Sequence, residues 1–210
     1  MIQPIRLYGD PVLRRAARTV STFDAELASL AADLIDTMIE ADGLGLAAPQ
    51  IGIGARVFVV AGAATEPERP PSLEDEPAEA PHEPTLEEQR ARALVFVNPR
   101  LEARQGRRSG IEGCLSLPGL YHENVERSAR LLVRYQDLHG AWHECAAAGR
   151  FAVVLQHESD HLDGVLFLDR LSEAERYAFM DEHRLELAQM QRDAKAALRR
   201  DARVSARVGG

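Results

Sequence analysis

Apolar residues recur every three or four positions over residues 21–43, and this spacing predicts an amphipathic helix. Leu27 and Leu34 would lie two turns apart on its buried face. Ser21 or Thr22 is expected to cap its N-terminus, because a hydroxyl oxygen can accept a hydrogen bond from the backbone N–H groups that the first turn leaves unpaired.

Two more helices are expected in the C-terminal half of the chain. One covers residues 150–164 and is expected to be buried, since Val154 and Leu155 stand directly before its polar residues. The other begins at Ser172, where Glu175 completes a capping box, and continues as one long helix to about residue 200.

Short runs rich in valine and phenylalanine predict β-strands. Residues 55–61 (ARVFVVA) and 93–99 (ALVFVNP) are expected to form a hairpin, and residues 130–149 to form two strands around a turn. Together with the helices, these strands predict an α+β fold: antiparallel or mixed β-sheets around a buried central helix, with a long C-terminal helix.

Residues 62–93 would form a long insertion in the first hairpin. Within it, residues 66–88 hold nine acidic residues, one arginine and six of the eleven prolines of the chain. This composition is typical of a disordered surface loop. The net charge of −8 belongs to this segment, because 24 basic and 24 acidic residues remain outside it.

No apolar run reaches the length of a membrane span, and the N-terminus MIQPIRLYGDPVLRR has no apolar stretch typical of a signal peptide, so a cytoplasmic protein is expected. In that reducing compartment, Cys114 and Cys145 are not expected to form a disulfide. Either thiolate could instead act as a nucleophile or bind a metal ion.

The sequence QHESDHLDG, residues 156–164, places His157 and His161 four positions apart on the predicted buried helix. Side chains at this spacing share one face, where two imidazoles can bind one ion. Glu158, between them, could take a proton from a water on that ion. A catalytic ion normally has three protein ligands, so one ligand must come from elsewhere.

We favour Cys114 as the third ligand. It stands in SGIEGCLSLPG, a glycine-rich segment expected to expose its backbone, and one thiolate with two imidazoles makes a soft site suited to Zn²⁺ or Fe²⁺. Cys145 is interpreted as a small buried strand residue. The remaining histidines considered lie in a loop, a turn and a surface helix: His82, His139 and His183.

Two other interpretations of the motif remain. A metallopeptidase of the HExxH type would complete its site with a downstream carboxylate, for which Asp169 and Glu173 are available. A structural zinc domain would need four ligands, and Cys145 could be the fourth.

A third segment, GLGLAAPQIG at residues 43–52, is uncharged and would let another chain approach its backbone closely. Gln50 within it could polarise a carbonyl group. The segments GLGLAAPQ, EGCLS and QHESDHLDG, in this order, resemble the peptide deformylases. The resemblance extends over about residues 4–170 and includes the opening IRLYGDPVLRR.

The resemblance implies a metal-dependent hydrolase that removes the N-formyl group from the N-terminal formyl-methionine of newly made polypeptides. The implied metal ligands are Cys114, His157 and His161. Glu158 would be the general acid/base, while Gln50 and the backbone N–H of Leu115 would hold the formyl oxygen. Substrate would be bound by Gly43, Leu44, Gly45, Glu112, Gly113, Val153 and Val154. Behind the ligands, Asp160 is expected to pair with Arg127, since a buried carboxylate needs a partner.

The implied cofactor is one divalent ion. The family favours Fe²⁺, and a site of one thiolate and two imidazoles also accepts Zn²⁺, Ni²⁺ or Co²⁺. The expected partners are nascent formyl-Met polypeptides, with no membrane, and the protein is expected to be a monomer.

We expect residues 1–171 to form one catalytic domain and residues 172–210 a C-terminal helix with a basic tail. From Arg192 onward there are six basic and two acidic residues, a charge that favours phosphate-rich surfaces. The resemblance implies that such a helix docks on the ribosome. The competing interpretation of these charges is a solvated helix end. Removing residues 192–210 would then leave the hydrolysis of free peptides unchanged.

Overall fold

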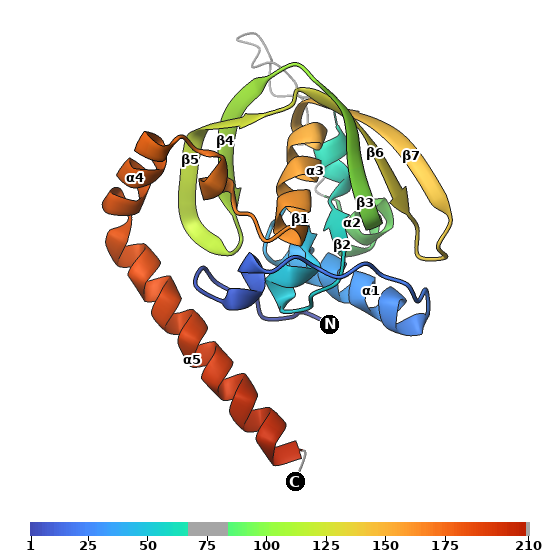
Figure 1. Ribbon diagram of the computed structural model, residues 1–210. Helices are drawn as coiled ribbons and strands as arrows, with labels where there is room; N and C mark the ends of the chain where they lie inside the picture. The colour runs from blue at the N-terminus through green and yellow to red at the C-terminus, as the bar shows by residue number, and fades with distance from the viewer. Residues whose placement is uncertain (67–83, 209–210) are drawn as a thin grey trace.

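Strand β2 (Val57–Val60) is a run of four apolar residues that are all fully buried. Because successive side chains of a strand point to opposite faces, both faces of its sheet must be covered. The odd-numbered valines pack with helix α1 (Ala25–Glu40), and the other two residues pack with helix α3 (Gly149–Leu162). The sheet therefore lies between these two helices, and α3 is the predicted buried central helix (Figure 1).

The computed structural model describes the backbone of residues 1–66 and 84–208. Five strands form one sheet in the order β1–β2–β3–β6–β7, two form the β4–β5 hairpin, and every neighbouring pair is antiparallel. Both predicted hairpins are present, as β2–β3 and β6–β7. The strands other than β2 are β1 (Gly45–Ala47), β3 (Leu94–Gln105), β4 (Arg108–Cys114), β5 (Leu117–Arg127), β6 (Arg130–Gln136) and β7 (Trp142–Ala148).

A separate apolar cluster fills the space under the β4–β5 hairpin. It joins Leu117 of β5 to Phe167, to Phe179 of helix α4 (Glu173–Glu182) and to Leu187 of helix α5 (Arg184–Val208). The C-terminal helices are thus held by the hairpin. Four short 3-10 turns complete the described elements: η1 (Pro11–Arg14), η2 (Ala48–Ile51), η3 (Gly62–Thr65) and η4 (Phe167–Arg170).

The predicted first helix is present as α1, but its cap is neither Ser21 nor Thr22. Asp24 is the N-cap, and its carboxylate accepts hydrogen bonds from the backbone N–H groups of Glu26 and Leu27 at 3.0 and 3.1 Å. A charged acceptor at this position also interacts favourably with the positive end of the helix dipole, which a hydroxyl group does less well.

The expected single C-terminal helix is two helices. The Ser172–Glu175 capping box is present and starts α4, but the helix ends at Glu182 and α5 begins two residues later. No glycine or proline marks this break. The backbone leaves the helical conformation at His183 (φ −100°, ψ 25°). Helix α4 rests on the β4–β5 hairpin, where Phe179 contacts the ring of His122, and α5 runs on past the N-terminal segment (Figure 1).

The insertion at residues 62–93 is not irregular throughout. Its start forms η3, and its end forms helix α2 (Leu86–Arg92), which has a capping box made by Thr85 and Glu88. The prediction of disorder for the acidic centre, residues 67–83, lies outside the described residues.

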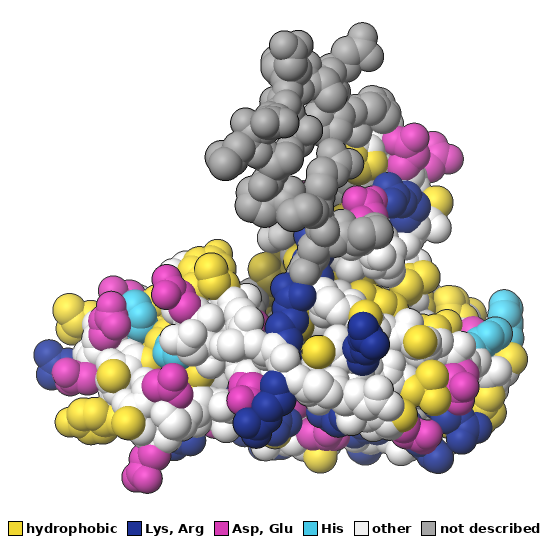
Figure 2. All heavy atoms as spheres, turned by 90° about the horizontal axis from the view of Figure 1, so that it is seen from above, with side chains coloured by type: hydrophobic (Ala, Val, Ile, Leu, Met, Phe, Trp, Pro, Cys, Tyr) yellow, Lys and Arg dark blue, Asp and Glu magenta, His cyan; other side chains and the backbone are white. Residues whose placement is uncertain are grey.

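On the face seen in Figure 2, basic and acidic side chains are interspersed. None of the described helices is both long enough and apolar enough to span a bilayer.

Candidate metal centre and catalytic site

Helix α3 presents two histidines to the end of strand β4. His157 and His161 lie one turn apart, with ring centroids separated by 5.0 Å. Cys114, the last residue of β4, places Sγ 3.2 Å from Nε2 of His161. One ligand atom from each of the three residues lies within 4.8 Å of the other two. The structure therefore brings together the three residues that were expected to bind a metal ion.

None of the other candidate ligands that the structure describes joins this group. Cys145 packs against the core on the sheet, His183 packs against an aromatic ring of α4, and His82 lies outside the described residues. Asp169 pairs with Arg14. Within the part of the chain that the structure describes, Cys114 and its two histidines form the only group of three or more such residues able to hold an ion. Among the residues that the structure describes, neither a downstream carboxylate nor a fourth ligand lies in this group.

The donor set fits one catalytic divalent ion. A thiolate and two imidazoles supply three ligands and leave a fourth position open. Nδ1 of His157 lies 2.8 Å from Oε2 of Glu112, which leaves its Nε2 for an ion. Oε2 of Glu158 is buried without a hydrogen-bond partner among the described residues. Since an unpaired buried carboxylate oxygen is costly, a cation or a water beside it would account for its position.

Burial and hydrogen bonds shift the pKa values of these groups. Burial raises the pKa of Glu158 to about 7, so this carboxyl can accept and release a proton near neutral pH. Burial also lowers the pKa of His161 well below its ordinary value. For His157, burial acts to lower the pKa, but hydrogen bonds with Cys114 and Glu112 outweigh it and hold the pKa well above its ordinary value. Because only a neutral imidazole binds metal, protons compete with the ion for this site.

A buried arginine lies behind the ligands. Arg127 donates to both oxygens of Glu112, at 2.7 and 2.8 Å, and to Asp160 at 2.6 Å. The predicted ion pair between Asp160 and Arg127 is therefore present. Because Glu112 also contacts His157, these groups connect α3 to the β4–β5 hairpin and fix the orientation of the imidazole.

Glu112 was expected to bind substrate, and it does line the cleft. Its carboxylate, however, is occupied by Arg127 and His157. Burial acts to raise the pKa of Glu112, but the hydrogen bonds from these two residues outweigh it and lower the pKa to about 2. Its side chain therefore supports the ligand helix as an ionised group, and only its remaining surface faces the cleft.

Replacing Arg127 by methionine is expected to lower the free energy of unfolding by about 3–5 kcal/mol, because it leaves buried carboxylates without their cation. Arg170→Met is the matched control. Arg170 also donates to Asp160, but its side chain is 43% exposed, and its loss should cost at most about 1 kcal/mol. Urea unfolding of both variants measures the difference. Equal losses in the two variants would contradict this role of Arg127.

Gln50 faces the metal ligands from the other side. It is 1% exposed, and its Oε1 accepts a hydrogen bond from the backbone N–H of Ala47 at 2.8 Å. That bond fixes the orientation of the amide. Its Nε2 therefore points to Sγ of Cys114 at 3.6 Å and to Ser116 at 3.4 Å. Leu115 follows Cys114 directly, in the turn between β4 and β5, so two donors lie beside the thiol.

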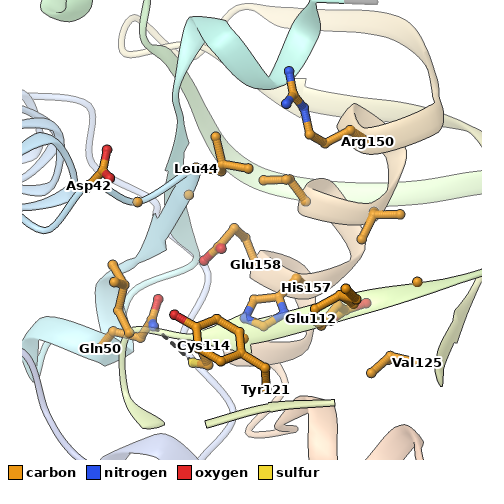
Figure 3. Close-up of a pocket in the computed structure, with 18 of the residues that line it drawn as sticks. Asp42, Leu44, Gln50, Glu112, Cys114, Tyr121, Val125, Arg150, His157 and Glu158 are labelled. Carbon is orange, nitrogen blue, oxygen red and sulfur yellow. Dashed lines mark hydrogen bonds and ion pairs between the residues drawn. The ribbon is translucent and has the colours of Figure 1, made fainter. Parts of the chain in front are cut away.

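A cleft of about 490 Å³ opens over these groups. Figure 3 shows Gln50, Cys114, His157 and Glu158 at one end of it, and Leu44 and Arg150 toward the other. Every residue expected to bind substrate lines this cleft: Gly43, Leu44, Gly45, Glu112, Gly113, Val153 and Val154.

Strand β1 forms one wall of the cleft and lies at the edge of the five-stranded sheet. An edge strand has backbone groups available to pair with an extended peptide. At Gly45 a methyl group would lie 2.6 Å from Oε1 of Glu158, so only glycine leaves room for the carboxylate here.

Sequence reasoning missed several residues of the site. Tyr121, Arg108 and Arg150 line the cleft, and Arg170 supports Asp160. Arg150 follows the start of α3 and donates to the carbonyl of Ala63 at 2.5 Å. None stands in a motif with a chemical signature, so no local pattern could have identified them.

Comparison with known proteins identifies the family of the chain. The model of the family described as "Polypeptide deformylase" matches residues 2–177. A peptide deformylase of Thermus thermophilus is 48% identical over 199 residues, covering 95% of this chain and 97% of the relative. A peptide deformylase of Alkalilimnicola ehrlichii is 42% identical over 83% of this chain and 85% of its own.

Solved structures are also similar. The crystal structure of a peptide deformylase from Thermus thermophilus superposes with a TM-score of 0.76 at 44% identity, over 92% of this chain and 99% of that one. The enzyme from Thermotoga maritima gives a TM-score of 0.66 at 36% identity, over 82% and 99%. With a family match over most of its length and relatives well above 30% identity, the chain belongs to the polypeptide deformylase family.

Proposed function

We propose that Cys114, His157 and His161 hold the one divalent ion with which this deformylase removes the N-formyl group from newly made polypeptides. The observation that carries the proposal is the approach of their three ligand atoms to within 4.8 Å of one another, at the end of a cleft. The thiolate favours a soft ion, and the family makes Fe²⁺ the proposed native metal, with Zn²⁺, Ni²⁺ and Co²⁺ as substitutes.

An ion in this site supplies Lewis-acid chemistry, by lowering the pKa of a water molecule and polarising the formyl carbonyl. Glu158 takes a proton from the attacking water and delivers it to the leaving amine. Its burial and its raised pKa support this role, since a general acid/base works best when its pKa lies near the working pH.

Two donors are proposed to stabilise the charge that develops on the formyl oxygen. Nε2 of Gln50 is already oriented by the bond from Ala47, and the N–H of Leu115 lies next to the ligand Cys114. Donors held in place before the reaction stabilise a transition state without a cost of reorganisation.

Substrate binding is assigned to the rest of the cleft. The methionine side chain would lie against Leu44, Val153 and Val154, and the peptide backbone would pair with the free edge of β1 at Gly45. A formyl group is small, so the space at the reacting end can be narrow. Gly45 and Gly113 have no side chain, which lets Glu158 and Tyr121 lie close to the backbone there.

The test combines metal content with hydrolysis of defined peptides. We expect about one ion per chain and release of formate from formyl-Met peptides. Acetyl-Met peptides, in which a methyl group replaces the formyl hydrogen, and internal peptide bonds should not be cut. Cleavage of internal bonds would instead identify a metallopeptidase, and bound metal without any hydrolysis would identify a structural site.

We also propose that the exposed basic residues of α5 contact ribosomal RNA. Deleting residues 192–210 is a poor test, because Ala194 is buried and Asp201 pairs with Arg6. Neutralising three exposed residues together avoids this problem: Lys195→Gln, Arg199→Gln and Arg200→Gln.

This triple variant should keep the turnover of free formyl-Met peptides and co-sediment more weakly with ribosomes, most clearly at low salt. The slope of affinity against salt should fall by about one unit for each phosphate group that the variant no longer neutralises. Neutralising three exposed acidic residues of α4 would control for net charge. Co-sedimentation that is unchanged across a salt series would identify these residues as solvated surface.

The proposed compartment is the cytoplasm, the proposed state is a monomer, and residues 1–171 are the proposed catalytic domain.

A further inference from the structure

The N-terminal segment, residues 6–10, is hydrogen-bonded to both sides of the proposed oxyanion site. The backbone N–H of Arg6 donates to the carbonyl of Gln50 at 2.7 Å, and that of Tyr8 donates to the carbonyl of Ser116 at 2.8 Å. Gln50 carries one proposed donor, and Ser116 directly follows Leu115, which carries the other. A shift of this segment would therefore shift the backbone that carries both donors.

The side chain of Arg6 covers the turn that carries Gln50. Gly52 ends this turn with φ +87°, and a methyl group there would lie 2.8 Å from Nε of Arg6. Only glycine adopts this backbone conformation readily and also admits the guanidinium so closely. Nε of Arg6 is buried and has no hydrogen-bond partner among the described residues, so the flat group packs against the turn rather than pairing there.

The other end of Arg6 is held by helix α5. Its Nη1 donates to Asp201 at 2.6 Å and lies 3.9 Å from Asp10. In its first third, α5 approaches so closely that a methyl group on Gly9, which has φ +101°, would lie 2.9 Å from Cα of Gln191. Helix α5 and the N-terminal segment are thus in direct contact at two places.

The same elements share one apolar cluster. Leu187 and Met190 of α5 are buried in it, and Leu7 and Cys114 pack against it. Helix α5, the N-terminal segment and the ligand Cys114 therefore pack in one cluster. Because protein interiors are close-packed, a displacement of one of these elements strains the others.

We propose that Arg6 is a positioning residue for deformylation: pinned to α5 through Asp201, it holds the Gln50 turn so that Nε2 of Gln50 meets the developing oxyanion. The proposal rests on the proposed role of Gln50. It assigns helix α5 a part in catalysis, in addition to any contact with a partner.

Arg6→Ala is expected to lower kcat by about 10- to 100-fold with KM and metal content unchanged. Removing one oxyanion donor costs about 10²–10³-fold in kcat, and a displaced donor loses part of that. KM should not change, because Arg6 does not line the cleft that holds the side chains proposed to bind the methionine. Arg90→Ala is the matched control, since Arg90 also pairs with an aspartate, Asp36 at 2.8 Å, but away from the cleft.

The decisive experiment is a double-mutant cycle of Arg6→Ala with Gln50→Ala. If Arg6 acts through Gln50, Arg6→Ala should change kcat by less than about twofold once Gln50 is alanine, since coupled residues are not additive. A purely structural effect would multiply with the loss from Gln50→Ala. If Arg6→Ala does not fold, Asp201→Asn in both backgrounds replaces it, because Asp201 is exposed and its substitution cuts only the link to α5.

Four results would overturn the proposal. They are an unchanged kcat in Arg6→Ala, multiplicative losses in the double variant, a fall in metal content that accounts for the loss, and a loss shared by Arg90→Ala. Failure of the proposed function has a different signature, because wild-type protein would then not release formate, or Gln50→Ala would turn over at the wild-type rate while Arg6→Ala did not.

Discussion

Cys114→Ala is expected to lose both the bound ion and deformylation. The side chain supplies the thiolate of a three-ligand site, and two histidines one turn apart on α3 cannot by themselves complete it. The metal content, measured after gel filtration, should fall from about one ion per chain to a small fraction of that, and formate release should fall to background. His157→Ala and His161→Ala should do the same, because each removes one of the same three donors.

Cys145→Ala is the matched control for this loss. It removes the other cysteine of the chain, which lies partly buried in β7 and packs against the core on the sheet. Because burial raises the pKa of the Cys145 thiol, this group is a poor ligand, and we expect full metal content and turnover without it. Full metal and activity in Cys114→Ala, or loss of the ion in Cys145→Ala, would show that the ligands are assigned wrongly.

Chemistry that is local in sequence could be predicted from the sequence. The spacing of His157 and His161 fixed their common helix face, and the apolar residues before them indicated burial. Both were confirmed by α3. The third ligand required more than spacing. Cys114 was favoured for its glycine-rich setting and its softness as a donor, and the resemblance to the deformylases then assigned it.

Features that depend on competition between neighbouring groups could not be predicted reliably. Ser21, Thr22 and Asp24 can all cap a helix, and only the folded backbone decides that Asp24 does. The break after Glu182 has no local signal either, because no glycine or proline stands there and residues on both sides of it pack in the same apolar cluster.

Long-range polar contacts were the least accessible from sequence. Asp160 and Arg127 were paired correctly because a buried carboxylate requires a cation, but the same reasoning did not reveal that Glu112 shares that cation and supports His157. Nor could it connect Arg6 to Asp201, which stands near the opposite end of the chain. Such contacts are specified by the three-dimensional arrangement, and many sequence patterns are compatible with each.

Glu158→Gln is expected to keep about one ion per chain while kcat falls by about 10²–10⁴-fold, the usual contribution of general acid/base catalysis. Glutamine has the size of glutamate, so it fits against Gly45, where the carboxylate now lies. It cannot accept the proton of the attacking water or pass one to the leaving amine. Its amide also relieves the buried charge, so the folded protein should be at least as stable as the wild type.

Metal content and kcat must be measured on the same preparation, because they separate two roles for this carboxylate. Glu126→Gln is the control, since it is the same substitution at an exposed position, where the carboxylate pairs with Arg107. If Glu158→Gln lost the ion together with its activity, the carboxylate would be a ligand. If turnover persisted within tenfold of the wild type, another group would have to move the proton. Oε2 of Glu158 is buried and has no hydrogen-bond partner among the described residues. This favours the role of proton carrier for Glu158, because a free carboxylate oxygen beside the ligands can receive a proton from water at the open position.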